Sequence, residues 1–337
     1  CNVAIEDLEN KVLGYKLKAV SGLGTFFQYV EPDELSSTVE IMSKPTLVTN
    51  SSDAIDVSMP QMAIFPGLED NHMRFGALCE RLKMAAVVLQ RGLDHQHETL
   101  SETANRLAEV ILKRTQVKKK FCLLGYETGV IIALEVASIL EQRGLTGTVF
   151  LLGGGPAEIQ AALTKELASY GTYSELQIAA AKHLCSLMAS EEKPEDAADI
   201  AEKVAASLNS GAPWSSLVEG CVRQLLGRVP HSAQYAQTLI ETVPAQIERA
   251  RTYKMQLPTL QSQLVVIHTA GTPERASDLQ RFSAQPLLEY NLNTPLGTIT
   301  DDLRVSSIVN RHLDSDILTA FNNTRLCIKY ALVRYDT

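Results

Sequence analysis

The segment Leu123-Leu124-Gly125-Tyr126-Glu127-Thr128-Gly129 carries the strongest structural signal in this 337-residue chain. A short apolar run, Phe121 to Leu124, leads into it, and an apolar stretch from Thr128 to about Leu140 follows it. A short apolar run bounded by a turn favours a buried strand, and the longer stretch favours a helix. The two glycines let the backbone turn tightly between them. The sequence therefore predicts a strand, a sharp turn that carries Glu127, and a helix.

This pattern matches the nucleophile elbow of α/β-hydrolases, G-x-S-x-G, with Glu127 at the position of the serine. In that motif the nucleophile lies on a strained turn between a strand and a helix. The glycine frame is present here, but the reactive hydroxyl is absent. The sequence thus predicts an α/β-hydrolase scaffold and raises the question of whether the chain catalyses any reaction.

Strands and helices alternate on both sides of this turn. Helices are expected at 99–114 and 128–142, and the first of them begins with a capping-box pattern, Thr99 with Glu102. Apolar strands are expected at 61–65, 85–89, 121–124, 148–152, 263–268 and 305–309. Such alternation indicates a mostly parallel central sheet flanked by helices.

A long insertion interrupts this alternation. Between about residues 157 and 254 the sequence is rich in Ala, Leu and Glu and shows no strand pattern. We interpret it as an all-helical lid above the sheet. Residues 58–337 then form one α/β-hydrolase domain. Residues 1–57 form an N-terminal extension that ends in a polar linker.

Composition narrows the classes of partner. A hydrophobic content of 45% and a charged content of 21% are ordinary for a globular protein. The net charge of −8 argues against nucleic acid and anionic membrane surfaces, which both reward basic patches. No apolar run approaches the ~20 residues that a membrane-spanning helix needs. We therefore expect no nucleic-acid partner and no membrane span.

Two short motifs fail as metal or cofactor sites. His95-Gln96-His97 supplies two imidazoles, whereas a zinc site needs three or four ligands. Gly153-Gly154-Gly155 follows a strand, but neither the dinucleotide nor the nucleotide-triphosphate fingerprint accompanies it. We expect no metal and no cofactor.

The compartment is only weakly indicated. Six cysteines are too few and too scattered for a disulfide scaffold, and whether Cys185 pairs with Cys221 is left open. Triplets that begin at Asn50 and Asn322 are N-glycosylation acceptors. These triplets shift the expectation slightly toward a secreted glycoprotein rather than a cytoplasmic protein.

Five segments, taken in order, resemble a known family. They are Phe65-Pro66-Gly67-Leu68-Glu69-Asp70, Gly125-Tyr126-Glu127-Thr128-Gly129, Phe150-Leu151-Leu152-Gly153-Gly154-Gly155-Pro156, Glu289-Tyr290-Asn291-Leu292 and Val309-Asn310-Arg311-His312. With a helical lid between them, they resemble the C-terminal thioesterase domain of animal fatty acid synthase over about residues 58–335. The resemblance implies an α/β-hydrolase fold and a serine, histidine and aspartate triad that hydrolyses acyl thioesters.

The N-terminal extension has a weaker similarity to the same synthase. There a carrier domain precedes the thioesterase, and the serine of a D-S-L motif bears phosphopantetheine. Asp33-Glu34-Leu35 lies in a similar place here, again with glutamate in place of serine. The segment is too short for a whole carrier fold. Two interpretations stay open, a degenerate carrier remnant and an N-terminal extension docked on the domain.

The resemblance places a degenerate triad at Glu127, Gly153 and His312. The oxyanion hole would use the backbone N–H of Thr128 and one from the loop near Leu68. A carboxylate has no proton for a histidine to remove, and Gly153 cannot orient a histidine. We therefore predict a protein that is not an enzyme. For Glu127 itself, a pair with His312 and a solvated carboxylate without a partner are both open.

The resemblance also implies a groove that binds the acyl chain. Loss of the triad would leave that groove open. The leading hypothesis is a pseudoenzyme that binds, stores or carries a hydrophobic ligand such as a fatty acid, a lipid or a carotenoid-like pigment. The residues expected to contact it are Leu68, Tyr126, Glu127, Thr128 and His312. Two alternatives are a structural or storage protein with an idle pocket, which would self-associate, and a hydrolase that uses the Glu127 carboxylate.

Overall fold

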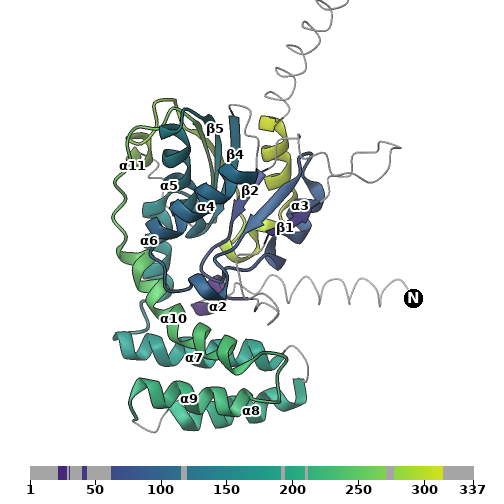
Figure 1. Ribbon diagram of the computed structural model, residues 1–337, viewed down its shortest axis with the longest axis vertical. Coiled ribbons are helices and arrows are strands. Elements are labelled where there is room, and N and C mark those ends of the chain that lie inside the picture. The colour runs from purple at the N-terminus through teal and green to yellow at the C-terminus, as the bar shows by residue number, and fades with distance from the viewer. Residues whose placement is uncertain are drawn as a thin grey trace, which may run out of the picture.

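The centre of the molecule is a twisted, mostly parallel sheet (Figure 1). The computed structural model describes residues 22–28, 30, 40–43, 62–114, 120–190, 194–208, 212–270 and 277–313. Within them, the strand order is β1-β3-β2-β4-β5-β6-β7; β1 is antiparallel to β3 and the other neighbours are parallel. The strands are β1 Glu40–Ser43, β2 Met62–Phe65, β3 Ala86–Leu89, β4 Lys120–Tyr126, β5 Thr146–Leu152, β6 Gln263–His268 and β7 Leu288–Asn291.

Helices cover both faces of this sheet. One face packs against α4 and α5, and the other carries α3, η3 and a helix over residues 303–313. The bounds outside the lid are α2 Leu23–Phe26, η1 Met73–Phe75, α3 Gly76–Arg81, η2 Leu93–His95, α4 Leu100–Arg114, α5 Gly129–Gln142, α11 Ser277–Gln280 and η3 Leu296–Asp301. Side chains of β4 alternate between the two cores, so this strand lies at the centre of the packing.

The lid is helical, as the sequence predicts. It comprises α6 Pro156–Glu166, α7 Tyr173–Ser190, α8 Pro194–Leu208, α9 Trp214–Leu225 and α10 Ala233–Thr252. Helices α7, α8 and α9 stack below the sheet, and α10 leads back to it (Figure 1). Cys185 and Cys221 are buried free thiols in contact across α7 and α9. No helix among the described residues is both long and apolar enough to cross a membrane.

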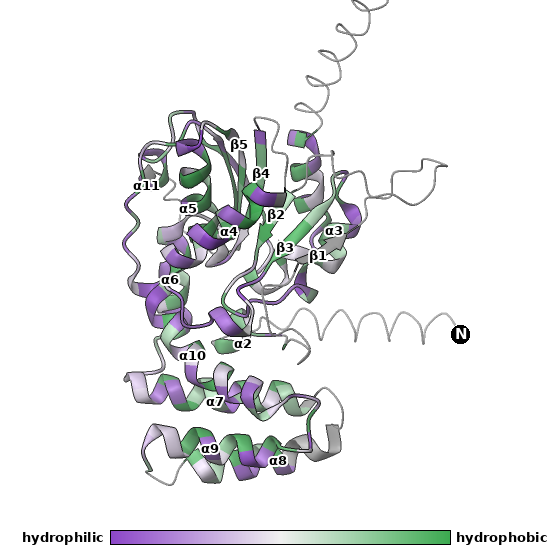
Figure 2. Ribbon diagram, viewed as in Figure 1, coloured by the Kyte–Doolittle hydropathy of each residue, from purple (hydrophilic) through white to green (hydrophobic). Residues whose placement is uncertain are grey.

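The hydropathy of the elements explains these positions. Strand β4 and helix α5 are hydrophobic along most of their length, whereas α4 has a polar outer side (Figure 2). Helix α5 therefore lies buried between the sheet and α4, with most of its residues inaccessible to solvent. Thr99 and Glu102 form the predicted capping box, with backbone N–H bonds in both directions.

The α/β-hydrolase fold class is confirmed, but one predicted strand is wrong. Residues 305–309 belong to the helix over 303–313, and the last strand of the sheet is Leu288–Asn291. Val305, Val309 and Leu313 are all buried, at a spacing of four residues. A helix places residues four apart on one face, whereas a strand would also bury Ser307 and Arg311 on that face, and both are exposed.

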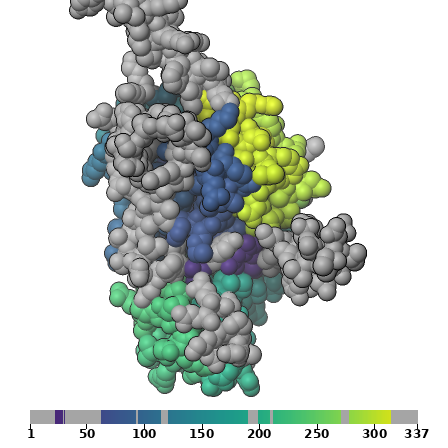
Figure 3. Space-filling view, turned by 90° about the vertical axis from the view of Figure 1, so that its right-hand side faces the viewer, coloured from purple at the N-terminus to yellow at the C-terminus, as the bar shows by residue number. Residues whose placement is uncertain are grey.

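Part of the N-terminal extension belongs to the same core. Leu23, Phe26, Phe27 and Val30 are buried among residues of the sheet and the lid, and β1 adds an edge strand. Figure 3 shows the purple N-terminal residues between the green lid and the blue and yellow residues above it. Asp33-Glu34-Leu35, Asn50 and Asn322 lie outside the described residues, so the carrier and glycosylation predictions stay predictions, as does the domain boundary at 57/58.

Candidate functional site

The turn between β4 and α5 has the strained geometry of a nucleophile elbow. Glu127 has φ of +53°, and Asp70 is the only other non-glycine residue with positive φ in the described part of the chain. Only glycine fits at the two positions that flank the turn, because a Cβ atom there would overlap the backbone. A Cβ on Gly125 would lie 2.5 Å from the carbonyl oxygen of Gly129, and one on Gly129 would lie 2.1 Å from that of Phe65. The backbone of the elbow is thus preserved around a different side chain.

The Glu127 carboxylate lies between two backbone amides. Its Oε2 accepts the backbone N–H of Leu68 at 3.2 Å, and its Oε1 accepts that of Thr128 at 3.1 Å. These are the two donors that the family resemblance assigns to the oxyanion hole. Glu127 is fully buried. The interpretation of Glu127 as a solvated carboxylate without a partner is therefore wrong, because the side chain turns inward to satisfy both amides.

Burial dominates the electrostatics of this carboxyl group. It raises the pKa of Glu127 to about 7, because water that would solvate the charge is excluded. The hydrogen bonds from Leu68 and Thr128 act in the opposite direction, since they stabilise the charged form. Near neutral pH the group is therefore close to half-protonated.

Gly153, where the resemblance predicts the triad acid, lies beside the elbow among apolar side chains. Gly153 follows β5 and has φ of +113°. A Cβ there would lie 2.7 Å from Leu296 Cδ1, 3.2 Å from Ile159 Cδ1 and 3.8 Å from the Glu127 nitrogen. No carboxylate fits at this position without displacing Leu296.

His312 belongs to a different part of the molecule. It lies on the helix over 303–313, and its Nε2 is 3.0 Å from the hydroxyl of Tyr290 in β7. Its ring also packs edge-on against Phe150. Within the described residues, the Glu127 carboxylate is hydrogen-bonded by the two backbone amides and by no histidine. The structure thus brings Glu127 together with Leu68, Thr128 and Gly153 but does not pair it with His312.

The residues predicted to contact a ligand at the elbow are closed off. Leu68 and Thr128 are each 3% exposed, and Tyr126 and Glu127 are completely buried. The Tyr126 hydroxyl is already used, since it donates to the Leu296 carbonyl at 3.0 Å. In this conformation the elbow offers no surface to a ligand.

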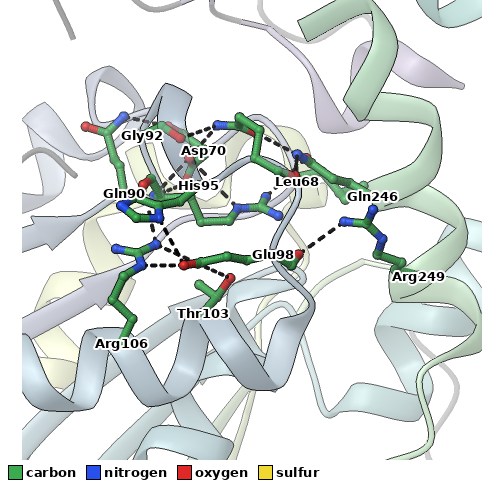
Figure 4. Close-up of polar contacts among 12 residues, drawn as sticks. Leu68, Asp70, Gln90, Gly92, His95, Glu98, Thr103, Arg106, Gln246 and Arg249 are labelled. Carbon is green, nitrogen blue, oxygen red and sulfur yellow. Dashed lines mark hydrogen bonds and ion pairs between the residues drawn. The ribbon is translucent and has the colours of Figure 1, made fainter. Parts of the chain in front are cut away.

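A buried polar network holds the loop that supplies the Leu68 amide (Figure 4). The Asp70 carboxylate accepts the backbone N–H of Arg91 at 2.9 Å and the side-chain amide of Gln96 at 3.3 Å. Gln246 of α10 then accepts from Arg91 Nη2 at 3.2 Å and donates to Gln96 Oε1 at 2.5 Å. One set of hydrogen bonds therefore joins the lid to the loop at 65–70, which carries the Leu68 amide.

Glu98 makes a second connection to lid helix α10, beside the one made by Gln246 (Figure 4). Its carboxylate accepts from Arg106 at 2.8 Å and from Thr103 at 3.1 Å, and its carbonyl accepts from Arg249 of α10 at 3.1 Å. The first link uses the loops that follow strands β2 and β3, and the second uses the loop that follows β3. They hold the lid against the carboxyl edge of the sheet.

The sequence analysis missed a charged cluster at the end of β6. His268 Nε2 lies 3.0 Å from Glu289, and its Nδ1 lies 3.4 Å from Glu158 Oε1. Glu158 also accepts the backbone N–H of Gly155 and so caps α6. The carboxylates of Glu158 and then Glu289 raise the pKa of His268. In the described part of the chain, no three His, Cys, Asp or Glu residues are grouped to hold a metal ion.

Part of a solved multidomain protein shares the fold of this chain. The chain is similar to the four-domain nonribosomal peptide synthetase AB3403, solved with AMP and glycine bound, with a TM-score of 0.53 and 13% identity over 75% of this chain and 19% of that one. It therefore spans about a fifth of the length of that synthetase.

Two shorter proteins are matched over most of their own length. One is the Vlm2 thioesterase domain bound with a dodecadepsipeptide, with a TM-score of 0.49 and 14% identity over 75% of this chain and 93% of that one. The other is the type II thioesterase BorB from the borrelidin cluster, with a TM-score of 0.47 and 15% identity over 82% and 96%. No protein-family model and no curated protein sequence matches the chain.

Proposed function

We propose that this chain is a catalytically inactive, thioesterase-like protein. The observation that carries the proposal is the position of the Glu127 carboxylate, which accepts both backbone amides of the oxyanion hole. Acyl transfer needs a nucleophile at this turn and an open hole for the developing oxyanion. Here the position of the nucleophile holds an acid, and the same acid occupies the hole.

A reaction through the Glu127 carboxylate itself is disfavoured by the same contacts. Both oxygens already accept N–H groups, and the side chain has no exposed surface from which to attack a substrate. An ester intermediate would also need a base to activate water. His312 bonds Tyr290 instead, and the residues that follow β7, 292–295, carry no ionisable side chain.

Descent from a thioesterase of the fatty acid synthase type belongs to this proposal. The order of the elbow, the loop at 65–70 and the strand that ends in Gly153-Gly154-Gly155 supports it. The segments at 289–292 and 309–312 support this descent less. Residues 289–292 cover the end of the last strand and the residue after it, and residues 309–312 lie within a helix. The structural neighbours reported above support only the shared thioesterase-like fold.

Hydrolysis of acyl thioesters of several chain lengths tests the proposal. We expect the purified protein to release no thiol above the rate in buffer, and a fluorophosphonate, which labels activated serines, to leave it unlabelled. Glu127→Gln is assayed in parallel. Turnover by the natural protein that disappears in Glu127→Gln would show that the carboxylate is a catalytic group and would overturn the proposal.

A second candidate function is binding of a small hydrophobic molecule without turnover. The observation that favours it is a cavity of about 260 Å³ beside the end of β6, away from the closed elbow. In this second candidate function the ligand binds at the cavity and does not contact Leu68, Tyr126 or Thr128. Self-association into a defined oligomer without any ligand would favour the alternative of a structural or storage protein.

A further inference from the structure

The cavity beside β6 has the walls of a small-molecule site. It lies at the carboxyl end of β6, the edge at which open α/β sheets bind ligands. Its volume of about 260 Å³ is near the lower end of the ~300–1,000 Å³ that ligand pockets span. Apolar walls come from several elements, among them Pro156, Met255, Val266, Leu279 and Phe282. A small ligand, or one end of a longer one, fits this space.

Two cations line the cavity in addition to these apolar walls. Lys254 and Arg281 are exposed, and neither forms an ion pair with any residue in the described ranges. The Arg281 guanidinium lies 4.6 Å from the centre of the Phe282 ring, which orients it by a cation–π contact. The charges of both side chains are therefore available to a ligand.

The other ionisable groups that line the cavity do not cancel this charge. His268 is held toward its protonated form by Glu158, whose own charge also serves the Gly155 N–H. Asp278 is exposed and is the remaining acidic side chain of the lining. The charges that are not engaged within the protein are thus two positive and one negative.

We propose that this cavity binds a small amphipathic carboxylate, with its apolar chain between Met255, Val266 and Phe282 and its charge at Lys254 and Arg281. The proposal rests on the second candidate function above and specifies its ligand. Carboxylates form charge-assisted hydrogen bonds with guanidinium and ammonium groups. Burial of the apolar chain contributes roughly 25 cal/mol per Å². Recognition therefore needs both parts of the ligand.

Calorimetric titration with three compounds separates these parts. Octanoate has the chain and the charge, octanol has the chain alone, and acetate has the charge alone. We expect octanoate to bind at least tenfold more tightly than octanol, and acetate to show no measurable binding. Equal affinity for octanoate and octanol, or no binding of octanoate, would overturn the proposal.

Variants locate the site. The double variant Lys254→Gln/Arg281→Gln is expected to weaken octanoate binding at least tenfold and to leave octanol unchanged. The matched control is Lys182→Gln/Arg223→Gln, which removes two exposed cations from lid helices α7 and α9; its affinity for octanoate should equal that of the natural protein. Octanoate binding that is equal in the two double variants would place the ligand elsewhere and contradict the proposal.

A variant that fills the space provides a second criterion. Ala157 is exposed at the start of α6 and lines the cavity, so Ala157→Trp blocks it without disturbing the core. It should abolish binding of octanoate while the unfolding temperature stays unchanged; retained binding would contradict the location. Failure of these titrations leaves the thioesterase assay unaffected, because that assay depends on Glu127 alone.

Discussion

The elbow and the β6 cavity lie at the same edge of one sheet and differ in almost every physical property. At the elbow, a carboxylate is completely buried and both of its oxygens accept backbone donors. At the cavity, two cations are exposed above apolar walls and have no acidic partner among the described residues. The comparison shows that the strained turn at Glu127 is part of the protein's core, whereas open, charged surface lies further along the sheet.

This difference predicts opposite responses to mutation. Residues at the elbow should control stability, because their contacts are internal and complete. Lys254 and Arg281 at the cavity should control binding, because both side chains are exposed to solvent. The predictions below test this contrast, from the largest expected effect to the smallest.

The largest effect is expected for Gly153→Asp, the substitution that places an acid at the predicted triad position. The new Cβ meets Leu296 and Ile159 at a φ of +113°, and the carboxylate is buried beside Glu127. Backbone strain and overpacking each cost about 1–3 kcal/mol, so we expect a loss of roughly 3–5 kcal/mol in the free energy of unfolding. Urea unfolding measures it.

Gly144→Asp is the matched control for this variant. Gly144 has φ of +79°, and a Cβ added there would meet no atom within 4 Å. Only the backbone strain remains there, so the cost should be about 1–2 kcal/mol. Equal losses at the two glycines would show that Leu296 and Ile159 do not fill the acid position. Because a side chain at Gly153 meets Leu296 and Ile159, we predict that Glu127→Ser with Gly153→Asp shows no activity in the thioester assay described above.

The second-largest effect is a pH dependence of the free energy of unfolding that comes from Glu127. Its pKa is raised from 4.5 to about 7 in the folded protein. The stabilisation from the bound proton is therefore complete below pH 4.5 and is lost as pH rises through about 7. Between pH 5 and 8 the natural protein should lose about 2.5 kcal/mol of stability relative to Glu127→Gln.

The glutamine variant begins from a lower stability at pH 5. Its amide NH₂ group faces a backbone N–H and cannot accept from it, which costs about 1–3 kcal/mol. Urea unfolding of both proteins at the two pH values gives the difference. Glu219→Gln, at an exposed position on α9, is the control and should track the natural protein. A pH-independent gap for Glu127→Gln would contradict a buried, shifted carboxyl group.

The third-largest effect is a loss of stability when the hydrogen bonds between the lid and the loop at 65–70 are removed. Gln246→Ala removes the acceptor for Arg91 Nη2 and the donor to Gln96 Oε1 inside the core. We expect a loss of about 1–3 kcal/mol, with faster amide hydrogen exchange in α10 and in residues 67–71. Gln237→Ala, exposed on the same helix, should leave both unchanged. Unaltered exchange in the loop would show that the two regions are not coupled.

The smallest effect is expected at the cavity. Arg281→Gln loses its contact with Phe282, which is worth about 0.5–1 kcal/mol at an exposed position. Lys254→Gln should change the free energy of unfolding by no more than about 0.5 kcal/mol. Thermal and urea unfolding test both. A loss above about 2 kcal/mol at either position would mean that the cavity is part of the structural core.

The sequence predicted most of the fold because its strands are short, apolar and separated by turn residues. The error at 305–309 arose because a buried helix face and a short apolar strand are difficult to separate within five residues. Extending the window to Leu313 shows the helical spacing. The strand Leu288–Asn291 was missed because its burial alternates and it has few apolar residues.

The sequence predicted the backbone of the elbow but not the direction of its side chain. Leu68 and Thr128 were identified as oxyanion donors because their role belongs to the backbone and survives substitution. That Glu127 turns inward to meet them depends on its length and on Gly67, where a Cβ would lie 2.2 Å from the carboxylate. The cluster of Glu158, His268 and Glu289 was missed because these residues are far apart in the sequence and meet only where α6, β6 and β7 come together.

The most direct measurement is an NMR titration of the Glu127 carboxyl carbon together with the amide protons of Leu68 and Thr128. We predict one transition with an apparent pKa of about 7, in which both amide protons shift with the carboxyl carbon because they donate to it. A carboxyl carbon that titrates near 4.5, with the two amides unaffected, would contradict the account.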